Sequence, residues 1–296
     1  LTALPAGNLT GALPAISGAN LTGIAATDNV RTGILEVAGI ATFSSDVKIG
    51  AAVTISESGI EASGIGITCA NINGTQIGGR RNLIINGAME VAQRGTSSTS
   101  TSNGYYTVDR FSYAAGGTDE APTHAQVDVA SGTSPYQAGF RKAFKITNGN
   151  QTGGAGVTDY VFVRQTIEAQ NLAKCGWNYT SATSYVTMSF WVKSSVAQNF
   201  YGHIETGDGT SYNFPFETGS LTADTWKKVV IKIPGNSNLT FDNNNGGGMS
   251  ITFTPFYGTD YSSGVSVNEW INYAVANLTP AQTSTWYTTN DATWEM

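Results

Sequence analysis

Aromatic and polar side chains alternate along two short stretches in the second half of the chain. In Tyr201-Gly-His-Ile-Glu205, the period of two of a β-strand would place the first, third and fifth residues on one face. The next stretch, 212–216, carries an aromatic ring at every second position. Aromatic rings stack on the C–H faces of sugars, while carboxylates and imidazoles hydrogen bond sugar hydroxyls. If the strands adjoin, their faces form one polar and aromatic patch that could bind a sugar. The alternative is that a second protein layer or another copy of the chain covers these faces. An earlier strand would add Tyr185, Trp191 and Lys193 to the patch.

Two loops between the expected strands also have a composition suited to recognition. Tyr257-Gly-Thr-Asp-Tyr-Ser-Ser-Gly264 combines aromatic and polar residues, and loops on a rigid scaffold commonly carry recognition. The segment 236–248 is rich in Asn and Gly, and its simpler interpretation is a solvated turn. The predicted glycan-binding residues are Tyr201, His203, Tyr212, Tyr257, Asp260 and Tyr261.

The sequence gives little support for catalysis. A glycosidase needs two carboxylates about 5 to 9.5 Å apart, and Glu205 and Glu217 are the only pair on neighbouring predicted strands that we consider. The chain has 2 His, at positions 124 and 203, and no Gly-x-Ser-x-Gly motif, so a hydrolase triad is not indicated. We therefore expect a protein that is not an enzyme, with a glycan depolymerase as the weaker alternative.

No motif requires a metal or an organic cofactor. Asp208-Gly-Thr and Asp242-Asn-Asn-Asn245 are rich in the oxygen atoms that Ca²⁺ prefers, but neither has the spacing of an EF-hand. We expect no cofactor, and a structural Ca²⁺ is the one ion that we consider. Cys69 and Cys175 are lone cysteines in different segments, which argues against a disulfide framework and against a cysteine metal site.

The composition points to a β-rich extracellular protein and excludes several classes of partner. Charged residues make up 12% of the chain, about half of the usual roughly 25%, whereas Gly occurs 35 times. Hydrophobic residues, at 40%, are sufficient for a core. The net charge of −6 argues against nucleic acid, which requires clustered Lys and Arg. No apolar run reaches the roughly 18 residues of a membrane span, so membrane insertion is not expected.

From residue 81 onward, alternating runs predict an antiparallel β-sandwich. They recur about every 8 to 15 residues between clusters of Gly, Asn, Ser and Pro. Val186, Met188, Phe190 and Val192 should face the core, and one helical turn is expected within 165–174. Val229, Ile231 and Ile233 repeat the core pattern. The predicted strands are 83–85, 105–113, 125–129, 140–147, 160–168, 184–193, 200–205, 212–216, 226–234, 250–256 and 270–278.

The first 80 residues have a different character. Leu4-Pro-Ala-Gly-Asn-Leu-Thr-Gly11 returns with an insertion as Leu13-Pro-Ala-Ile-Ser-Gly-Ala-Asn-Leu-Thr-Gly23, and such repeats bury their apolar side only against neighbours or other chains. In 34–80, Val, Ile and Thr alternate with Gly, Ser and charged residues, as in short half-buried strands. Because so few residues bury little surface alone, we expect a self-associating shaft, most simply a homotrimer. A flexible linker is the alternative for 1–33.

Several segments resemble a known family. Asn82-Leu-Ile-Ile-Asn-Gly-Ala-Met-Glu-Val-Ala-Gln-Arg-Gly95, followed by Tyr106-Thr-Val-Asp-Arg-Phe111, is similar to the start of the jelly-roll domain of tailed-phage tail fibres. The runs 187–194 and 226–234 are similar to paired strands of carbohydrate-binding-module sandwiches, and 39–50 resembles the fibre shafts of marine phages. The resemblance implies an all-β protein with an elongated trimeric β-rich shaft, 1–33 and 34–80, followed by an antiparallel β-sandwich (jelly-roll) head, 81–296.

The resemblance also implies a function. A tail fibre is a virion protein that acts outside the host cell and mediates attachment, here with a head that binds a host surface glycan such as lipopolysaccharide. Its partners would be further copies of itself, other tail or virion proteins reached through a preceding N-terminal part, and the host glycan. Because residue 1 falls inside a repeat and 292–296 begin a predicted strand, we expect a longer chain. The main alternative is a structural fibre segment or virion decoration whose receptor-binding tip lies beyond residue 296.

Overall fold

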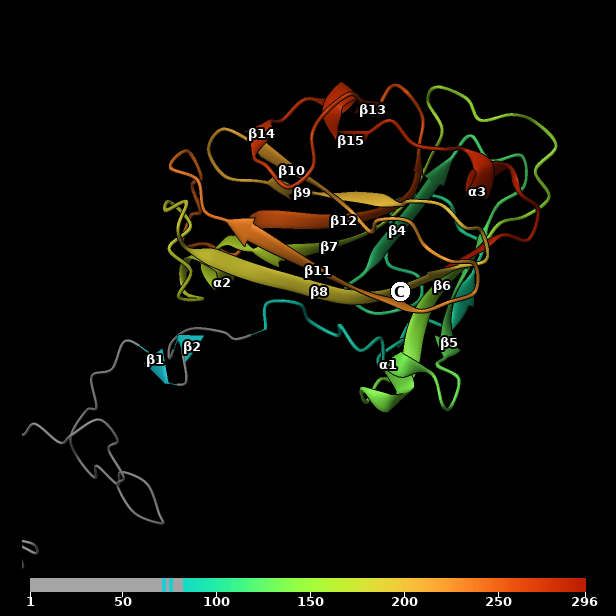
Figure 1. Cartoon of the computed structure of the whole chain (residues 1–296), viewed down its shortest axis with the longest axis horizontal. Helices are drawn as coiled ribbons and strands as arrows, with labels where there is room; N and C mark the ends of the chain where they lie inside the picture. The colour runs from blue at the N-terminus through green and yellow to red at the C-terminus, as the bar shows by residue number, and fades with distance from the viewer. Residues whose placement is uncertain (1–70, 73–74, 77–81) are drawn as a thin grey trace, which may run out of the picture. The chain divides into compact units, whose positions relative to one another are not determined.

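The computed structural model describes residues 71–72, 75–76 and 82–296 of the chain (Figure 1). At its start, β1 (Asn71–Ile72) and β2 (Thr75–Gln76) pair as a two-stranded antiparallel sheet. The rest of the predicted shaft, 1–33 and 34–80, lies outside the described residues. The domain boundary at residue 81 and the trimeric assembly therefore stay predictions.

Residues 82–296 form a β-sandwich of two six-stranded antiparallel sheets, which confirms the all-β class predicted for this part of the chain. Sheet I has the order β14 (Ile271–Asn272), β10 (Tyr212–Glu217), β9 (Tyr201–Thr206), β12 (Gly247–Tyr257), β7 (Tyr160–Glu168) and β4 (Ser112–Gly116). Sheet II has the order β11 (Lys227–Pro234), β8 (Tyr185–Ser194), β16 (Thr293–Glu295), β6 (Lys142–Thr147), β5 (Thr123–Asp128) and β3 (Ser97–Ser98).

Short elements complete the sandwich. β13 (Ser262–Ser263) and β15 (Thr279–Pro280) form a small parallel pair, with a 3₁₀ helix, Val275–Asn277, between them in the chain. The α-helices are α1 (Ser134–Gln137), α2 (Ala169–Ala173) and α3 (Thr285–Thr288); α2 is the predicted helical turn. Within the described ranges, none of the helices has the length and apolar character needed to cross a membrane.

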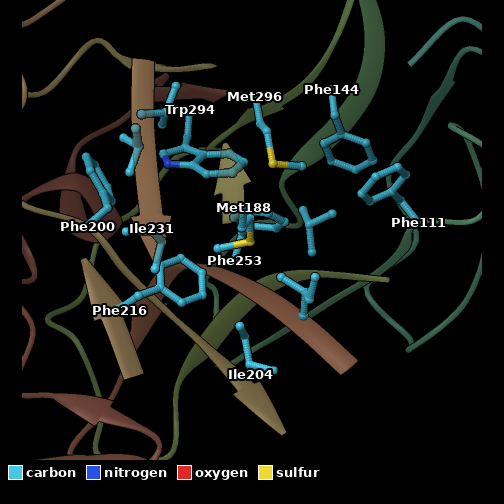
Figure 2. Close-up of a cluster of buried hydrophobic side chains, with 14 of the residues drawn as sticks. Phe111, Phe144, Met188, Phe200, Ile204, Phe216, Ile231, Phe253, Trp294 and Met296 are labelled. Atoms are coloured by element: carbon cyan, nitrogen blue, oxygen red, sulfur yellow. The ribbon is translucent and has the colours of Figure 1, made fainter. Parts of the chain in front are cut away.

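Alternating side chains fill the space between the two sheets. In β7, Val161, Val163 and Ile167 are buried, and the residues between them are mostly half-buried. In β11 the residues predicted to face the core are buried, and those between them are exposed. Each large apolar side chain that is fully buried stabilises the fold by about 1.5–3 kcal/mol. Figure 2 shows rings and aliphatic groups of both sheets meeting in this core: Ile204, Phe216 and Phe253 from sheet I, and Met188, Ile231 and Trp294 from sheet II.

The predicted strands from 125–129 to 250–256 correspond in order to β5 through β12, with ends shifted by a few residues. Two other predicted strands were largely wrong. Only the last two residues of 105–113 lie in β4, because Arg110 takes a left-handed φ of 73° that breaks the run. In 270–278 only Ile271–Asn272 is a strand, and a 3₁₀ helix follows it.

The predicted opening strand, 83–85, is not a strand. Its apolar run is short, and Asn86 turns the chain at once with a left-handed φ of 58°. The N–H of Ile85 donates to Oε1 of Gln165 at 2.8 Å, and Nε2 of Gln165 donates back to the Ile85 carbonyl at 2.9 Å. A side-chain amide of β7 thus takes the place of a neighbouring strand and holds this segment against the sandwich.

Candidate functional site

The outward side of sheet I, called the outer face below, collects polar side chains in register. Thr252 of β12 pairs directly with Arg164 of β7 on one side and with His203 of β9 on the other. Two residues earlier in β12, Ser250 pairs with Glu205 of β9. Side chains two residues apart on a strand share a face, and directly paired residues do as well. All five residues therefore point away from the core on the same side of the sheet.

Arg164 is the central charge of the outer face. Alternation in β7 buries Val163 and Gln165 in the core and turns Arg164 outward, where it is half-buried. Its Nε donates to Oγ1 of Thr252 at 3.0 Å, and its guanidinium carbon lies 4.9 Å from the centre of the Phe162 ring. Over residues 82–296, no carboxylate forms an ion pair with it. Its terminal N–H groups are therefore open to an acceptor from outside the chain.

Glu205 provides a complementary acceptor on the other side of β12. It is half-buried, and no described residue donates a hydrogen bond to its carboxylate. Burial raises the pKa of Glu205, and the nearby Arg164 opposes this shift by favouring the charged form. Burial likewise raises the pKa of Tyr273, and the charge of Glu205 adds to that shift. These mutual effects mean that Arg164, Glu205 and Tyr273 surround one patch of the surface.

Aromatic rings border this patch. The rings of Tyr160 and Phe162, alternate outward residues of β7, have centres 5.8 Å apart, and Tyr261 meets Tyr160 edge-on at 5.9 Å. Tyr257 packs against Phe162 at 6.3 Å and against Tyr261 at 5.3 Å. The rings of Tyr160, Phe162 and Tyr261 are half-buried, so part of each reaches solvent. Apolar ring surface beside charged donors and acceptors suits a ligand that has both hydroxyls and C–H faces.

His203 lies beneath the outer face in a buried hydrogen-bonded relay. Nδ2 of Asn213 donates to the carbonyls of Asn277 and Leu278 at 3.0 and 2.9 Å, so its Oδ1 is left to accept from Nδ1 of His203 at 3.0 Å. Nε2 of His203 faces the hydroxyl of Tyr257 at 3.5 Å. Burial lowers the pKa of His203 to about 3, so the ring is neutral at pH 7 with its proton on Nδ1. The relay fastens the 3₁₀ segment to sheet I.

Two of the predicted glycan-binding residues are covered. His203 and Tyr257 are 0% and 4% exposed, because β13, β15 and the segment between them lie over β9 and β10 (Figure 1). The prediction that these two side chains are offered at the surface was wrong. Tyr201 and Tyr261 are half-buried on the same side of sheet I, and Asp260 is exposed.

Tyr212 faces the opposite way from the outer face. The register pairs Glu205 with Asn213, so Tyr212 and its alternate neighbours Phe214 and Phe216 point into the sandwich. The single patch predicted from the two stretches was wrong, because an offset of one residue turns the whole aromatic set of β10 to the other face. The remaining members of that patch, Tyr185, Trp191 and Lys193, lie on β8 in sheet II.

Several residues of the candidate site were not predicted. Tyr160, Phe162 and Arg164 belong to β7, whose burial alternates over its whole length. The sequence signal was available there, since a lone arginine in an alternating apolar strand marks an outward face. Tyr273 follows the short strand β14 in a segment whose path depends on the Asn213 hydrogen bonds, so no local pattern indicated its position.

The two carboxylates considered for catalysis are far apart. Glu217 pairs with Tyr201, at the opposite end of β9 from Glu205. Four residues of strand span about 13 Å, which exceeds the roughly 5 to 9.5 Å that glycosidase carboxylates require. Glu217 is also engaged, since it accepts a hydrogen bond from Nδ2 of Asn199 at 2.6 Å. This pair therefore does not support the depolymerase alternative.

The two segments considered for Ca²⁺ meet in the fold. The N–H of Asp242 donates to Oδ2 of Asp208 at 3.0 Å, and Nδ2 of Asn244 donates to Oδ2 of Asp242 at 3.3 Å. One oxygen of each carboxylate thus accepts a hydrogen bond from an amide. In the part of the chain that the structure describes, no three His, Cys, Asp or Glu residues are grouped so as to hold an ion. A structural Ca²⁺ stays a prediction.

Comparison with solved structures finds a distant likeness. No protein-family model matches the chain, and no curated protein matches it. One matching solved structure is that of a Bacteroides thetaiotaomicron protein described as a proposed sugar binding protein. The match covers 72% of this chain and 95% of that one, with 13% identity and a TM-score of 0.37. At this distance the likeness carries no argument about function.

Proposed function

We propose that the outer face of sheet I binds a carbohydrate. The observation that carries the proposal is the presence of two half-buried side chains of opposite charge, Arg164 and Glu205, that flank β12 without forming an ion pair. Neighbouring sugar hydroxyls both donate and accept, so one ring can satisfy a guanidinium and a carboxylate together. The exposed parts of Tyr160 and Phe162 would receive its C–H face.

The favoured ligand is an uncharged sugar chain. Glu205 would repel an acidic sugar at the position where the patch needs a hydroxyl donor, and the net charge of −6 disfavours polyanions at longer range. Several weak contacts along a surface suit a polymer, because adjacent sugar units can occupy the aromatic border and the charged centre together.

We further propose that this surface serves attachment to a host cell, as the receptor-binding head of a tailed-phage tail fibre outside the cell. The support is the sequence resemblance of 82–95 and 106–111 to fibre heads and of the repeats in 1–33 to fibre shafts. Three copies on a shared shaft would raise weak glycan binding through effective concentration. Other tail or virion proteins would hold the fibre on the virion.

A glycan array probed with the full chain, followed by calorimetry on the best ligand, tests sugar binding. Glu205→Gln keeps the side-chain size and removes the charge, and Arg164→Gln replaces the guanidinium with a shorter, uncharged amide. A hydrogen bond to a charged group contributes about 1.5–3 kcal/mol, so each change should weaken binding roughly 10- to 100-fold. Arg141→Gln is the matched arginine control. The guanidinium of Arg141 also lies over an aromatic ring, that of Tyr136 at 3.9 Å, but Arg141 belongs to the segment between α1 and β6.

The exposed Glu90 provides the matched carboxylate control as Glu90→Gln, which should bind like the parent. If both site variants retain parental affinity, the outer face is not the sugar-binding surface. Absence of binding to every glycan tested would instead favour the structural alternative.

Sedimentation equilibrium of the full chain tests the trimer separately, and a monomeric mass at micromolar concentration would contradict it.

A further inference from the structure

Sheet II is interrupted where β16 ends. β16 lies between β6 and β8, but it pairs only with Lys193 and Ser194 of the ten-residue β8. From Tyr185 to Val192, β8 pairs with β11 alone within the described residues. β6 and β8 run in different directions away from β16, so the sheet forks (Figure 1). Among the strands that the structure describes, none adjoins this edge of β8 before the fork.

The backbone of β8 presents hydrogen-bonding groups to this open edge. On the β16 side of β8, the N–H of Ser195 donates to the carbonyl of Thr293 at 3.1 Å. Backbone groups alternate in direction from residue to residue along a strand, so every odd-numbered residue of β8 faces the same way as Ser195. Within residues 82–296, no strand pairs with that side before Lys193. The residues whose N–H and C=O groups face the fork are Thr187, Ser189 and Trp191.

An apolar groove of about 630 Å³ lies at the same edge. Its lining combines residues of both sheets with the segment that precedes them, among them Leu83, Phe140, Met188, Phe190, Ile251 and Phe253. Met188 and Phe190 point from β8 toward the core side. A strand laid along β8 would therefore send every second side chain into the groove, while its backbone met the free edge.

The opposite edge of the same sheet shows how this chain protects an unpaired strand. Of the described strands, β11 pairs only with β8, and its exposed residues include Lys228 and Lys232, with Pro234 at its end. Lysines and proline are devices that keep an edge strand from pairing with another chain. On the fork edge of β8, Thr187 is paired with Lys232 and Trp191 with Lys228, and Ser189 lies between them, so these positions carry neither lysine nor proline.

We propose that the fork is a β-augmentation site, which receives an extended segment of a partner protein as an added strand. The strand would run antiparallel to β8, in line with β16, and would span Thr187 to Val192, about 20 Å. Its residues would alternate between apolar and polar. A peptide is the occupant that fits, since a lipid or other apolar ligand fills the groove but leaves the backbone edge unpaired. This inference does not depend on the sugar-binding proposal.

Matched peptides test the proposal on the full chain. The probes are a panel of capped eight-residue peptides that alternate Val or Ile with Thr or Ser. Each has a partner peptide N-methylated at the residues that would face β8. Trp191 and Trp226 line the groove, so their fluorescence reports binding, and calorimetry gives affinity and stoichiometry. We expect 1:1 binding, at least tenfold weaker binding after N-methylation, and slower hydrogen exchange at Thr187 and Ser189.

A pair of proline variants locates the edge. Ser189 and Val230 are directly paired, yet their backbone groups point away from each other, toward the fork and toward the outer edge of β11. Proline at either position therefore leaves the β8–β11 hydrogen bonds intact. Ser189→Pro should weaken peptide binding at least tenfold, and Val230→Pro should stay within twofold of the parent.

Three results would overturn the proposal. Equal affinity for the methylated and unmethylated peptides would mean that the groove binds apolar groups without strand pairing. Failure of the whole panel to bind at millimolar concentration would mean that the edge accepts no added strand. Self-association that Ser189→Pro abolishes would assign the edge to a second copy of this chain. If Ser189→Pro does not unfold cooperatively, the variant is not properly folded. The comparison of methylated with unmethylated peptides on the parent chain then decides whether strand pairing occurs.

Discussion

The two sheets of the sandwich have equal numbers of strands but complete their hydrogen bonding in different ways. In sheet I the eleven-residue β12 is paired on both sides, with β7 and β9, over most of its length. In sheet II the three-residue β16 closes only one end of the gap between β6 and β8. Sheet I is thus a continuous surface, whereas in the described part of the chain sheet II has an edge of β8 that no strand pairs, beside an apolar groove.

This difference determines what each sheet can recognise. Where the backbone is fully paired, recognition falls to side chains, and sheet I offers the guanidinium of Arg164 and the carboxylate of Glu205 on its outer face. Where the backbone is unpaired, the peptide groups themselves are the donors and acceptors, as along β8. A sugar suits the first arrangement and an extended peptide the second. The predictions below test whether the two sheets differ in this way.

The largest expected effect compares a closed part of the core with the open groove. Phe214 of β10 is fully buried, with its ring 5.1 Å from that of Trp270. Phe190 of β8 lines the groove and is half-buried. Phe214→Ala should lower the free energy of unfolding by about 3–5 kcal/mol, and Phe190→Ala by clearly less. Urea denaturation followed by circular dichroism measures both. Equal losses would show that the groove side is packed as tightly as sheet I.

The next prediction concerns the two buried asparagines that fasten irregular segments to the sheets. Asn213→Ala leaves the carbonyls of Asn277 and Leu278 without their donor and His203 without its acceptor, so we expect a loss of about 2–4 kcal/mol. Asn148, which donates to the carbonyl of Trp286 at 2.7 Å beside sheet II, is the matched control.

Hydrogen exchange separates the two asparagine variants. Asn213→Ala should speed exchange in 258–281, and Asn148→Ala should speed it around α3 instead. If Asn213→Ala leaves exchange in 258–281 unchanged, the relay through His203 does not hold the segment that covers the outer face.

Each sheet also contains one buried histidine, which makes stability depend on pH. Burial lowers the pKa of His203 to about 3 and that of His124, stacked 4.1 Å from Tyr113, to about 4. The unfolded chain binds these protons near pH 6.5 and the folded chain does not, so stability is full above pH 6.5 and falls as the pH is lowered. Lowering the pH from 6.5 to 5 should therefore lower the free energy of unfolding by about 2 kcal/mol for each histidine.

Variants assign this pH dependence to the individual histidines. The difference in unfolding free energy between pH 7.5 and pH 5 should shrink by about 2 kcal/mol in His203→Gln and by a similar amount in His124→Phe. Carboxylates contribute equally to parent and variants, so the comparison isolates the rings. An unchanged difference in both variants would mean that the folded protein protonates these histidines normally.

Much of the sandwich could be predicted because alternation is a local property. The runs that became β5 through β12 each carry their own period of two, and Val229, Ile231 and Ile233 face the core as predicted. Alternation separates the aromatic face of a strand from its polar face, but it does not say which of the two meets the core. β10 is such a case, and its register against β9 placed Tyr212 on the core side.

The candidate site was harder to predict because its shape depends on distant hydrogen bonds. His203 looked like a surface group in the sequence, but the amide of Asn213 fastens residues more than sixty positions away over it. Arg164 needed no distant partner and was missed only because its strand was considered for its core face. The opening segment shows the converse, since Gln165 fixes Ile85 without any strand.

The smallest expected effect separates side-chain recognition on sheet I from backbone recognition on sheet II. Oγ of Ser250 on the outer face lies 2.9 Å from Oγ1 of Thr166, whereas Ser189 at the fork is exposed. Ser250→Ala should lower the free energy of unfolding by about 0.5–1 kcal/mol and weaken sugar binding several-fold. Ser189→Ala should change neither stability nor peptide affinity, because the fork binds through the peptide groups that alanine retains. If Ser189→Ala weakens the peptide as much as Ser189→Pro does, the hydroxyl rather than the backbone recognises the added strand, and the contrast between the two sheets fails.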